Sequence, residues 1–338
     1  MKRWFAALAV AGLVVAGCTD NSAVPTQATA PGTPNFMDVQ TGQSHIHIMP
    51  TKANAYGLDN QAKGSHGKPG GGGGGKTNTG IYYHGGPIIP SEHVVAIYWA
   101  SSTIYGGGPT PNTTGSAAQD GSLVGYFLSN LGGSPYYNIN TTYYDGSNVH
   151  VANDLSYAGF WATSANAPTS GQTVSDGAIQ TQIASGFASG ALTYDASTVY
   201  AVFGGPGVNL GGGFGSSYCA YHGNFSWNGH DVKYAVMPHN YDYPSGCSAL
   251  SGSPNNDYAA DAEVNTLAHE LEEANTDPDL NAWYDRRGYE NADKCAWKFG
   301  STYTTSNGAV ANIQVGSKDF LVQQNWVNAG SGGCLLSY

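Results

Sequence analysis

The sequence predicts an α/β protein: a single layered domain, residues 81–338, in which helices flank a mixed sheet and many loops connect the elements. Residues 94–99 and 199–203 are uninterrupted apolar runs of strand length, as in strands that are buried on both faces. Segments with helical spacing lie between these runs, and chains that alternate strands with helices form α/β layers. A hydrophobic content of 41% is sufficient for a core.

The charge and composition narrow the functional classes. The 338-residue chain has 12 Lys and Arg residues against 23 Asp and Glu residues, which gives a net charge of −11. Nucleic acids are bound by clustered Lys and Arg side chains, so the sequence excludes a nucleic-acid partner. The 48 glycines and 23 tyrosines of this weakly charged chain are typical of proteins outside the cytoplasm.

Residues 1–17 have the features of a signal peptide, because a basic start precedes an apolar run that is too short to cross a bilayer stably. The run ends in Val-Ala-Gly-Cys at 15–18, which resembles the lipobox of bacterial lipoproteins. We therefore expect Cys18 to be lipidated and to be the only membrane contact of a cell-envelope protein that faces away from the cytoplasm. In the alternative, Cys18 belongs to an ordinary signal peptide and the protein is secreted.

Residues 18–80, which begin with the lipidated cysteine, are expected to form a flexible, low-complexity tether. They are rich in Ser, Thr, Pro, Asn, Gln and Gly and include a glycine run at 70–75, so they bury little apolar area. Three histidines in this segment are therefore expected to be solvated: His45, His47 and His66.

The other elements follow from local patterns. Apolar residues recur at steps of three and four over 123–131 and again over 179–187, which predicts a helix in each segment. Residues 234–237 predict a later strand. The glycine-rich segments at 204–207 and 211–213 lack the spacing of a phosphate-binding turn and are expected to be loops.

The region between positions 257 and 293 is strongly acidic and contains eleven of the 23 acidic residues. Residues 257–275 have helical periodicity with an apolar stripe on one side. Asp257 or Asn256 is placed to cap the helix, and Pro278 is placed to end it. This concentration of negative charge requires either a cation or solvent.

Three polar residues of this helix have the spacing of a metal site. His269 and Glu273 lie one turn apart opposite the apolar stripe, with Glu270 about 100° from His269 on the same exposed half. The pattern resembles the zincin opening, with a glutamate in place of the second histidine. His269 and Glu273 can share one Zn²⁺, with Glu290 or Asp293 as a third ligand and Glu270 as the base that takes a proton from bound water. Ca²⁺ is the alternative metal for so many carboxylates, and an acidic face in water is the alternative to any metal.

The cysteines other than Cys18 are even in number and allow three pairings in two disulfides. We predict Cys219–Cys247 and Cys295–Cys334, because each pair joins neighbours in sequence and the second would hold the C-terminus beside the acidic site. This pairing leaves no thiol for nucleophilic chemistry, and the chain has no Gly-x-Ser-x-Gly nucleophile elbow.

Three further histidines are candidate site residues. His84 and His222 lie in glycine-flanked segments and could converge on the acidic helix as extra ligands, or each could be bonded within its loop. His239 follows the end of a predicted strand, where functional residues are common, but its structural role is the favoured interpretation.

Four motifs extend along the domain: Tyr-His-Gly-Gly-Pro at 83–87, Cys-Ala-Tyr-His-Gly at 219–223, His-Glu-Leu-x-Glu-Ala-x-Thr-Asp-Pro at 269–278 and Glu-x-x-Asp-x-Cys at 290–295. Together they resemble the phosphate-induced protein 1 or EXORDIUM group and its secreted bacterial branch, over residues 81–338. For the bacterial branch the resemblance implies a metallopeptidase-like site on the third motif. The plant members are extracellular, growth-related proteins.

Two functional classes follow. The first is a secreted, lipid-anchored metal-dependent hydrolase, most readily a peptidase that uses a metal-activated water. The second is a non-catalytic envelope or matrix protein whose acidic site holds a structural cation and whose aromatic surface binds a polymer. A third ligand that approaches His269 and Glu273 would favour the enzyme, whereas carboxylates dispersed into solvent would favour the binding protein.

Overall fold

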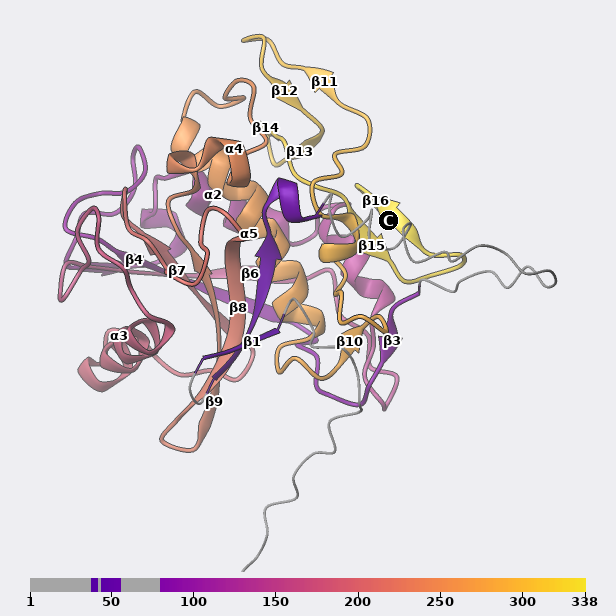
Figure 1. Cartoon of the computed structure of the whole chain (residues 1–338), viewed down its shortest axis with the longest axis horizontal. Coiled ribbons are helices and arrows are strands. Elements are labelled where there is room, and N and C mark those ends of the chain that lie inside the picture. Colours follow the sequence, from indigo (N-terminus) through magenta and orange to yellow (C-terminus); the bar gives the residue numbers. More distant parts are fainter. Residues whose placement is uncertain (1–37, 42–43, 56–79) are drawn as a thin grey trace, which may run out of the picture. The chain divides into compact units, whose positions relative to one another are not determined.

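An eight-stranded mixed sheet forms the centre of the computed structural model, which describes residues 38–41, 44–55 and 80–338 (Figure 1). The strand order is β1-β2-β8-β9-β7-β4-β6-β5. The four strands β9, β7, β4 and β6 are parallel to one another, and the other four pair antiparallel with their neighbours. The bounds are β1 Asp38–Thr41, β2 Ser44–Pro50, β4 Glu92–Trp99, β5 Thr113–Gly115, β6 Leu155–Thr163, β7 Thr198–Gly204, β8 Tyr218–Trp227 and β9 His230–Met237.

The central strands are buried on both faces, as their apolar sequences predicted. In β4, Val94 and Ala96 contribute to one core cluster, whereas Ile97 and Trp99 contribute to a second cluster across the sheet. Successive side chains of a strand point to opposite faces, so a strand covered on both sides needs an apolar residue at every position. The strands predicted at 94–99, 199–203 and 234–237 are confirmed as β4, β7 and β9.

Helices cover both faces of the sheet. α2 (Leu123–Leu131) and α5 (Tyr258–Thr276) pack into the first core cluster, and α3 (Asp176–Ser189) packs into the second, so α3 and α5 lie on opposite sides (Figure 1). Asp257 caps α5 as predicted, since its side chain accepts a hydrogen bond from the Ala260 amide at 3.2 Å. The predicted α/β class, with a mixed sheet flanked by helices, is confirmed.

Short elements complete the domain. They are β3 Tyr82–Tyr83 paired with β10 Trp283–Tyr284, β11 Tyr303–Thr304 with β12 Val310–Ala311, β13 Ile313–Val315 with β14 Lys318–Phe320, β15 Asn325–Val327 with β16 Gly333–Leu335, the helix α4 Pro244–Cys247, and the 3₁₀ helices η1 Ala117–Gln119, η2 Tyr137–Thr142, η3 Asn240–Asp242 and η4 Asp293–Cys295.

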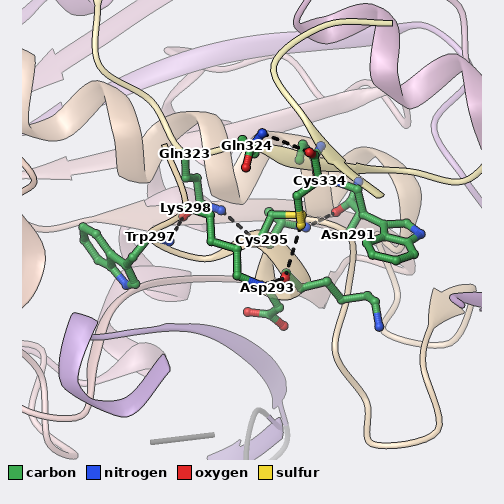
Figure 2. Close-up of a disulfide and its surroundings, with 12 residues drawn as sticks. Asn291, Asp293, Cys295, Trp297, Lys298, Gln323, Gln324 and Cys334 are labelled. Atoms are coloured by element: carbon green, nitrogen blue, oxygen red, sulfur yellow. Dashed lines mark hydrogen bonds between the residues drawn. A yellow bond between two sulfur atoms is a disulfide. The ribbon is translucent and has the colours of Figure 1, made fainter. Parts of the chain in front are cut away.

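Both predicted disulfides are present. Cys219–Cys247 joins β8 to α4, and Cys295–Cys334 joins η4 to β16 (Figure 2). Disulfides persist in oxidising compartments, so the pair is consistent with an extracellular or secreted protein. Among the described residues, no helix is both long enough and apolar enough to cross a membrane.

The expected tether needs a correction at its centre. Residues 38–41 and 44–50 fall within the predicted tether but form strands β1 and β2 of the sheet, where Ile46, Ile48 and Met49 are buried. In β2, Ile46 and Ile48 pack into the second core cluster, while His47 and Met49 are buried on the other face, so both faces of this strand are covered. The signal peptide, Cys18, and residues 19–37, 42–43 and 56–79 lie outside the described residues.

Candidate metal centre

The polar face of α5 is fully buried, whereas the helical periodicity placed it on the exposed half of the helix. His269, Glu270 and Glu273 are each 0% exposed. The helical spacing is as predicted and aligns His269 with Glu273, but β2, β8 and the segment around η4 lie against this face. Helical periodicity identifies a polar face but does not reveal what packs on it.

The sheet contributes two histidines to this face. β2 and β8 are antiparallel, and their register places His47 directly opposite His222. Cross-strand partners share one face of a sheet, and the two imidazole rings lie 5.5 Å apart. His222, considered above as an extra ligand, does converge on the acidic helix, and the expectation that His47 is solvated is wrong.

The segment after α5 contributes two carboxylates. The amide of Asp293 donates to Glu273 Oε1 at 2.9 Å, and the amide of Glu290 donates to Asp293 Oδ2 at 3.2 Å. Two residues after Asp293, Cys295 forms its disulfide with Cys334, while the Asp293 carboxylate points away from the sulfur atoms (Figure 2). Glu290 and Asp293, the two predicted candidates for third ligand, therefore both reach the helix.

These residues form one group, which we call the His/carboxylate cluster: His47, His222, His269, Glu270, Glu273, Glu290 and Asp293. Around His269, the Nε2 atom lies 3.2 Å from Glu273 Oε1 and 3.5 Å from Asp293 Oδ1. Ligand atoms about 2.0–2.1 Å from a tetrahedral Zn²⁺ are about 3.3 Å apart, so the three atoms have the spacing of ligands that share one cation.

The rest of the cluster surrounds His222 and His47. His222 Nδ1 lies 3.2 Å from Glu270 Oε2, and His222 Nε2 lies 3.7 Å from Glu290 Oε2. His47 Nε2 lies 2.6 Å from Asp293 Oδ2, and His47 Nδ1 lies 3.3 Å from Glu290 Oε1. Each of the four carboxylates therefore faces at least one imidazole.

Six buried atoms of the cluster have no hydrogen-bond partner among the described residues. They are His222 Nε2, His269 Nε2, Glu270 Oε1, Glu273 Oε2, Glu290 Oε2 and Asp293 Oδ1. A buried polar atom without a partner costs about 1–3 kcal/mol, and more when it is charged. A cation within the cluster would supply the missing partner to several of these atoms at once.

Burial and mutual charge shift the titration of the cluster. Burial raises the pKa of Glu270, Glu273 and Glu290 and lowers the pKa of His222 well below its ordinary value. Burial alone would also raise the pKa of Asp293, but the nearby His47 and His269 outweigh it and lower that pKa to about 2.

The pKa of His269 shifts in the opposite direction to that of His222. Burial acts to lower the pKa of His269, but the carboxylates of Glu273 and Asp293 outweigh burial and raise it well above its ordinary value. The two carboxylates that raise this pKa are the groups that a cation at His269 Nε2 would also contact.

Gln323 contacts the imidazole of His269 at Nδ1. No pattern in the sequence singled this residue out. Its Nε2 atom donates to the carbonyl of Ala292 at 2.8 Å and lies 3.0 Å from His269 Nδ1. A neutral imidazole that accepts at Nδ1 carries its proton on Nε2. A metal on Nε2 requires the proton on Nδ1, so metal binding would require the Gln323 amide to turn its oxygen toward the ring and give up its hydrogen bond to Ala292.

Two other candidates do not join the cluster. His84 stacks on Tyr284, with ring centroids 3.7 Å apart, and His239 lies 3.1 Å from Asp242. The side chain of His45 and the whole of His66 lie outside what the structure describes.

The sequence was also compared with known families. Residues 132–323, more than half of the chain, match the family described as phosphate-induced protein 1 conserved region. The chain belongs to the phosphate-induced protein 1 family. The matched region of this family contains six of the seven cluster residues, and His47 precedes it. Searches of curated proteins and of solved structures gave no match.

Proposed function

We propose that the protein is a metal-dependent hydrolase, a peptidase in its simplest form, whose Zn²⁺ is held by His269, Glu273 and Asp293. The observation that carries the proposal is the spacing around His269 Nε2, 3.2 Å to Glu273 Oε1 and 3.5 Å to Asp293 Oδ1, although that nitrogen has no hydrogen-bond partner. Short separations without hydrogen bonds are expected of atoms directed at a shared cation.

Glu270 is the proposed general base. It follows His269 in the chain, its Oε2 atom faces His222 Nδ1 at 3.2 Å, and its buried Oε1 atom has no partner among the described residues. Bound Zn²⁺ supplies a water of lowered pKa and polarises a carbonyl. Glu270 Oε1 would take the proton of that water and return it to the leaving amine.

A specific observation favours a second candidate, a structural cation in a non-catalytic envelope protein. His222, His269, Glu270 and Glu273 are all 0% exposed, so a substrate reaches the cluster only if a covering segment moves. A closed site with every ligand position filled is typical of structural metal sites. Ca²⁺ fits this alternative because four carboxylates supply oxygen ligands.

One experiment separates the two candidates. The full chain is purified, its metal content is measured, and it is screened against a broad peptide library alongside Glu270→Gln and His269→Ala. We expect Glu270→Gln to keep the metal and lose turnover, and His269→Ala to lose the metal and some stability. Glu272→Gln is the matched control, because Glu272 Oε2 instead accepts from Asn325 at 2.5 Å.

The outcomes are distinct. Cleavage by Glu270→Gln at the wild-type rate would overturn the proposed base and favour the structural cation. A wild-type chain that binds no metal would overturn both candidates.

The proposed location is the cell envelope, with Cys18 lipidated at the new N-terminus and the substrate a peptide or envelope polymer. The support is the lipobox-like Val-Ala-Gly-Cys sequence at 15–18 after an apolar run. Mass spectrometry of the mature N-terminus tests it, since cleavage at another bond or an unmodified Cys18 thiol would contradict lipid anchoring.

A further inference from the structure

We propose that the His/carboxylate cluster binds two divalent cations side by side. The first lies at His269 and Asp293, the second lies at His222 and Glu290, and Glu273 stands between them. This inference rests on the proposed function, which uses only the first position, and adds a second metal position to the same site.

Two buried atoms without hydrogen-bond partners, from different parts of the chain, are the proposed ligands of the second cation. His222 Nε2 on β8 and Glu290 Oε2 lie 3.7 Å apart, and the two side chains are 0% and 2% exposed. Neither atom has a hydrogen-bond partner among the described residues. Two atoms bound to one cation at about 2.1 Å reach this separation when the angle at the cation is about 120°.

The other nitrogen of His222 is arranged to support a metal at Nε2. His222 Nδ1 forms a hydrogen bond with Glu270 Oε2 at 3.2 Å. A carboxylate that accepts from one ring nitrogen fixes the tautomer and leaves the lone pair on the other nitrogen free to bind a metal. Glu270 would thus orient a ligand of the second cation through Oε2 and keep Oε1 for the proton transfer proposed above.

Glu273 lies beside all three histidines of the cluster. Its Oε1 atom lies 3.2 Å from His269 Nε2, while its Oε2 atom lies 3.7 Å from His222 Nδ1 and 3.9 Å from His47 Nε2. Glu273 Oε1 therefore faces the first position, while Oε2 lies near His47 and near the ring nitrogen of His222 that bonds Glu270. Glu273 is also the one residue shared by the three candidate ligand groups found among the described residues.

Four buried carboxylates meet in the cluster, and among the described residues their only ion-pair partners are histidines. Carboxylate oxygens and imidazole nitrogens are both ligands of divalent cations, so the cluster holds enough donor atoms for two ions.

A two-metal centre also suits hydrolysis. Paired cations about 3.5–4 Å apart stabilise the attacking and the leaving oxygens together. His47 lies against both positions, since Nε2 is 2.6 Å from Asp293 Oδ2 and Nδ1 is 3.3 Å from Glu290 Oε1. The strand that supplies His47 therefore helps to join the two positions.

The test uses the full chain, stripped by a chelator and loaded with Mn²⁺ alone. Bound Mn²⁺ is counted by equilibrium dialysis with elemental analysis, and electron paramagnetic resonance reports whether neighbouring ions are coupled. We expect two Mn²⁺ per chain with an exchange-coupled spectrum. Glu290→Gln should bind one ion with an uncoupled spectrum, and the control Glu272→Gln should bind two coupled ions.

A wild-type chain that binds one uncoupled ion, with Glu290→Gln unchanged, would overturn the second position and leave the proposed function intact. A wild-type chain that binds neither Mn²⁺ nor Zn²⁺ would overturn both. Circular dichroism establishes that each variant is folded. If Glu290→Gln does not fold, His222→Gln replaces it, and two coupled ions in that variant would equally contradict the proposal.

Discussion

Glu92, at the start of β4, allows a test of buried charge that does not depend on a metal. The carboxyl group is 0% exposed, its Oε2 atom accepts a hydrogen bond from the Tyr137 hydroxyl at 2.6 Å, and its Oε1 atom has no partner among the described residues. Burial raises the pKa of Glu92 from 4.5 to about 8, against the opposing effect of the Tyr137 bond. The informative change is Glu92→Gln, which keeps the shape and an acceptor for Tyr137.

The size of the effect follows from the two pKa values. In the unfolded chain Glu92 loses its proton above pH 4.5, whereas in the folded chain it keeps the proton up to about pH 8. The stability associated with the protonated group is therefore complete below pH 4.5 and is lost progressively as the pH rises toward 8. Between about pH 5 and pH 7.5 the wild type should lose about 3 kcal/mol relative to Glu92→Gln, at about 1.4 kcal/mol per pH unit.

Urea unfolding of both proteins at about pH 5 and pH 7.5 measures this difference. We expect nearly equal stability at the lower pH and a more stable Glu92→Gln at the higher pH. Tyr137→Phe removes the bond that lowers this pKa, so its stability should fall at least as steeply with pH as that of the wild type. Parallel pH profiles for wild type and Glu92→Gln would refute the reasoning, because they would show that Glu92 ionises alike in both states.

Three further predictions concern the fold and are measured by urea unfolding. Cys334→Ser opens the disulfide to Cys295, which spans 39 residues, and should cost about 4 kcal/mol by the loop-entropy relation; an unchanged midpoint under non-reducing conditions would contradict it. Leu271→Ala removes a fully buried side chain of the α5 stripe and should cost about 2–5 kcal/mol, whereas the half-exposed Leu335→Ala should change stability by less than about 0.5 kcal/mol. Gly132→Ala would drive a methyl group into the backbone of Leu155 and should lower the midpoint, unlike Gly177→Ala on α3, whose added methyl meets nothing within 4 Å.

The features that the sequence predicted well are those encoded by local patterns. The stripe that includes Val264 and Leu267 lies in the core as expected, and the cap at Asp257 forms as expected. These features depend on residues a few positions apart, where spacing alone determines which side chains share a face. The alternating strands and helices of the sheet were predictable for the same reason.

The cluster was predictable only in part, because its completion is non-local. His269 and Glu273 are one turn apart in sequence, but His47 reaches them through a β-ladder that pairs it with His222, far along the chain. A signal was present in Ser-His-Ile-His-Ile-Met at 44–49, where polar and apolar residues alternate as in a half-buried strand. The low-complexity composition on both sides of this short segment concealed it.

The cluster depends on four segments that are fixed by different interactions. The apolar stripe fixes α5, the disulfide and two backbone hydrogen bonds fix the segment 290–295, and the β2–β8 ladder fixes the two strands that bear His47 and His222. A chain shortened to residues 81–338 keeps every predicted ligand but loses the strand that bears His47. The buried side chains of Ile46, Ile48 and Met49 are each worth about 1.5–3 kcal/mol, and their loss would also leave the β8 edge unpaired. We therefore expect the shortened chain to be less stable and to bind Mn²⁺ more weakly than the full chain, and equal affinity in a direct titration would show that His47 is dispensable to the centre.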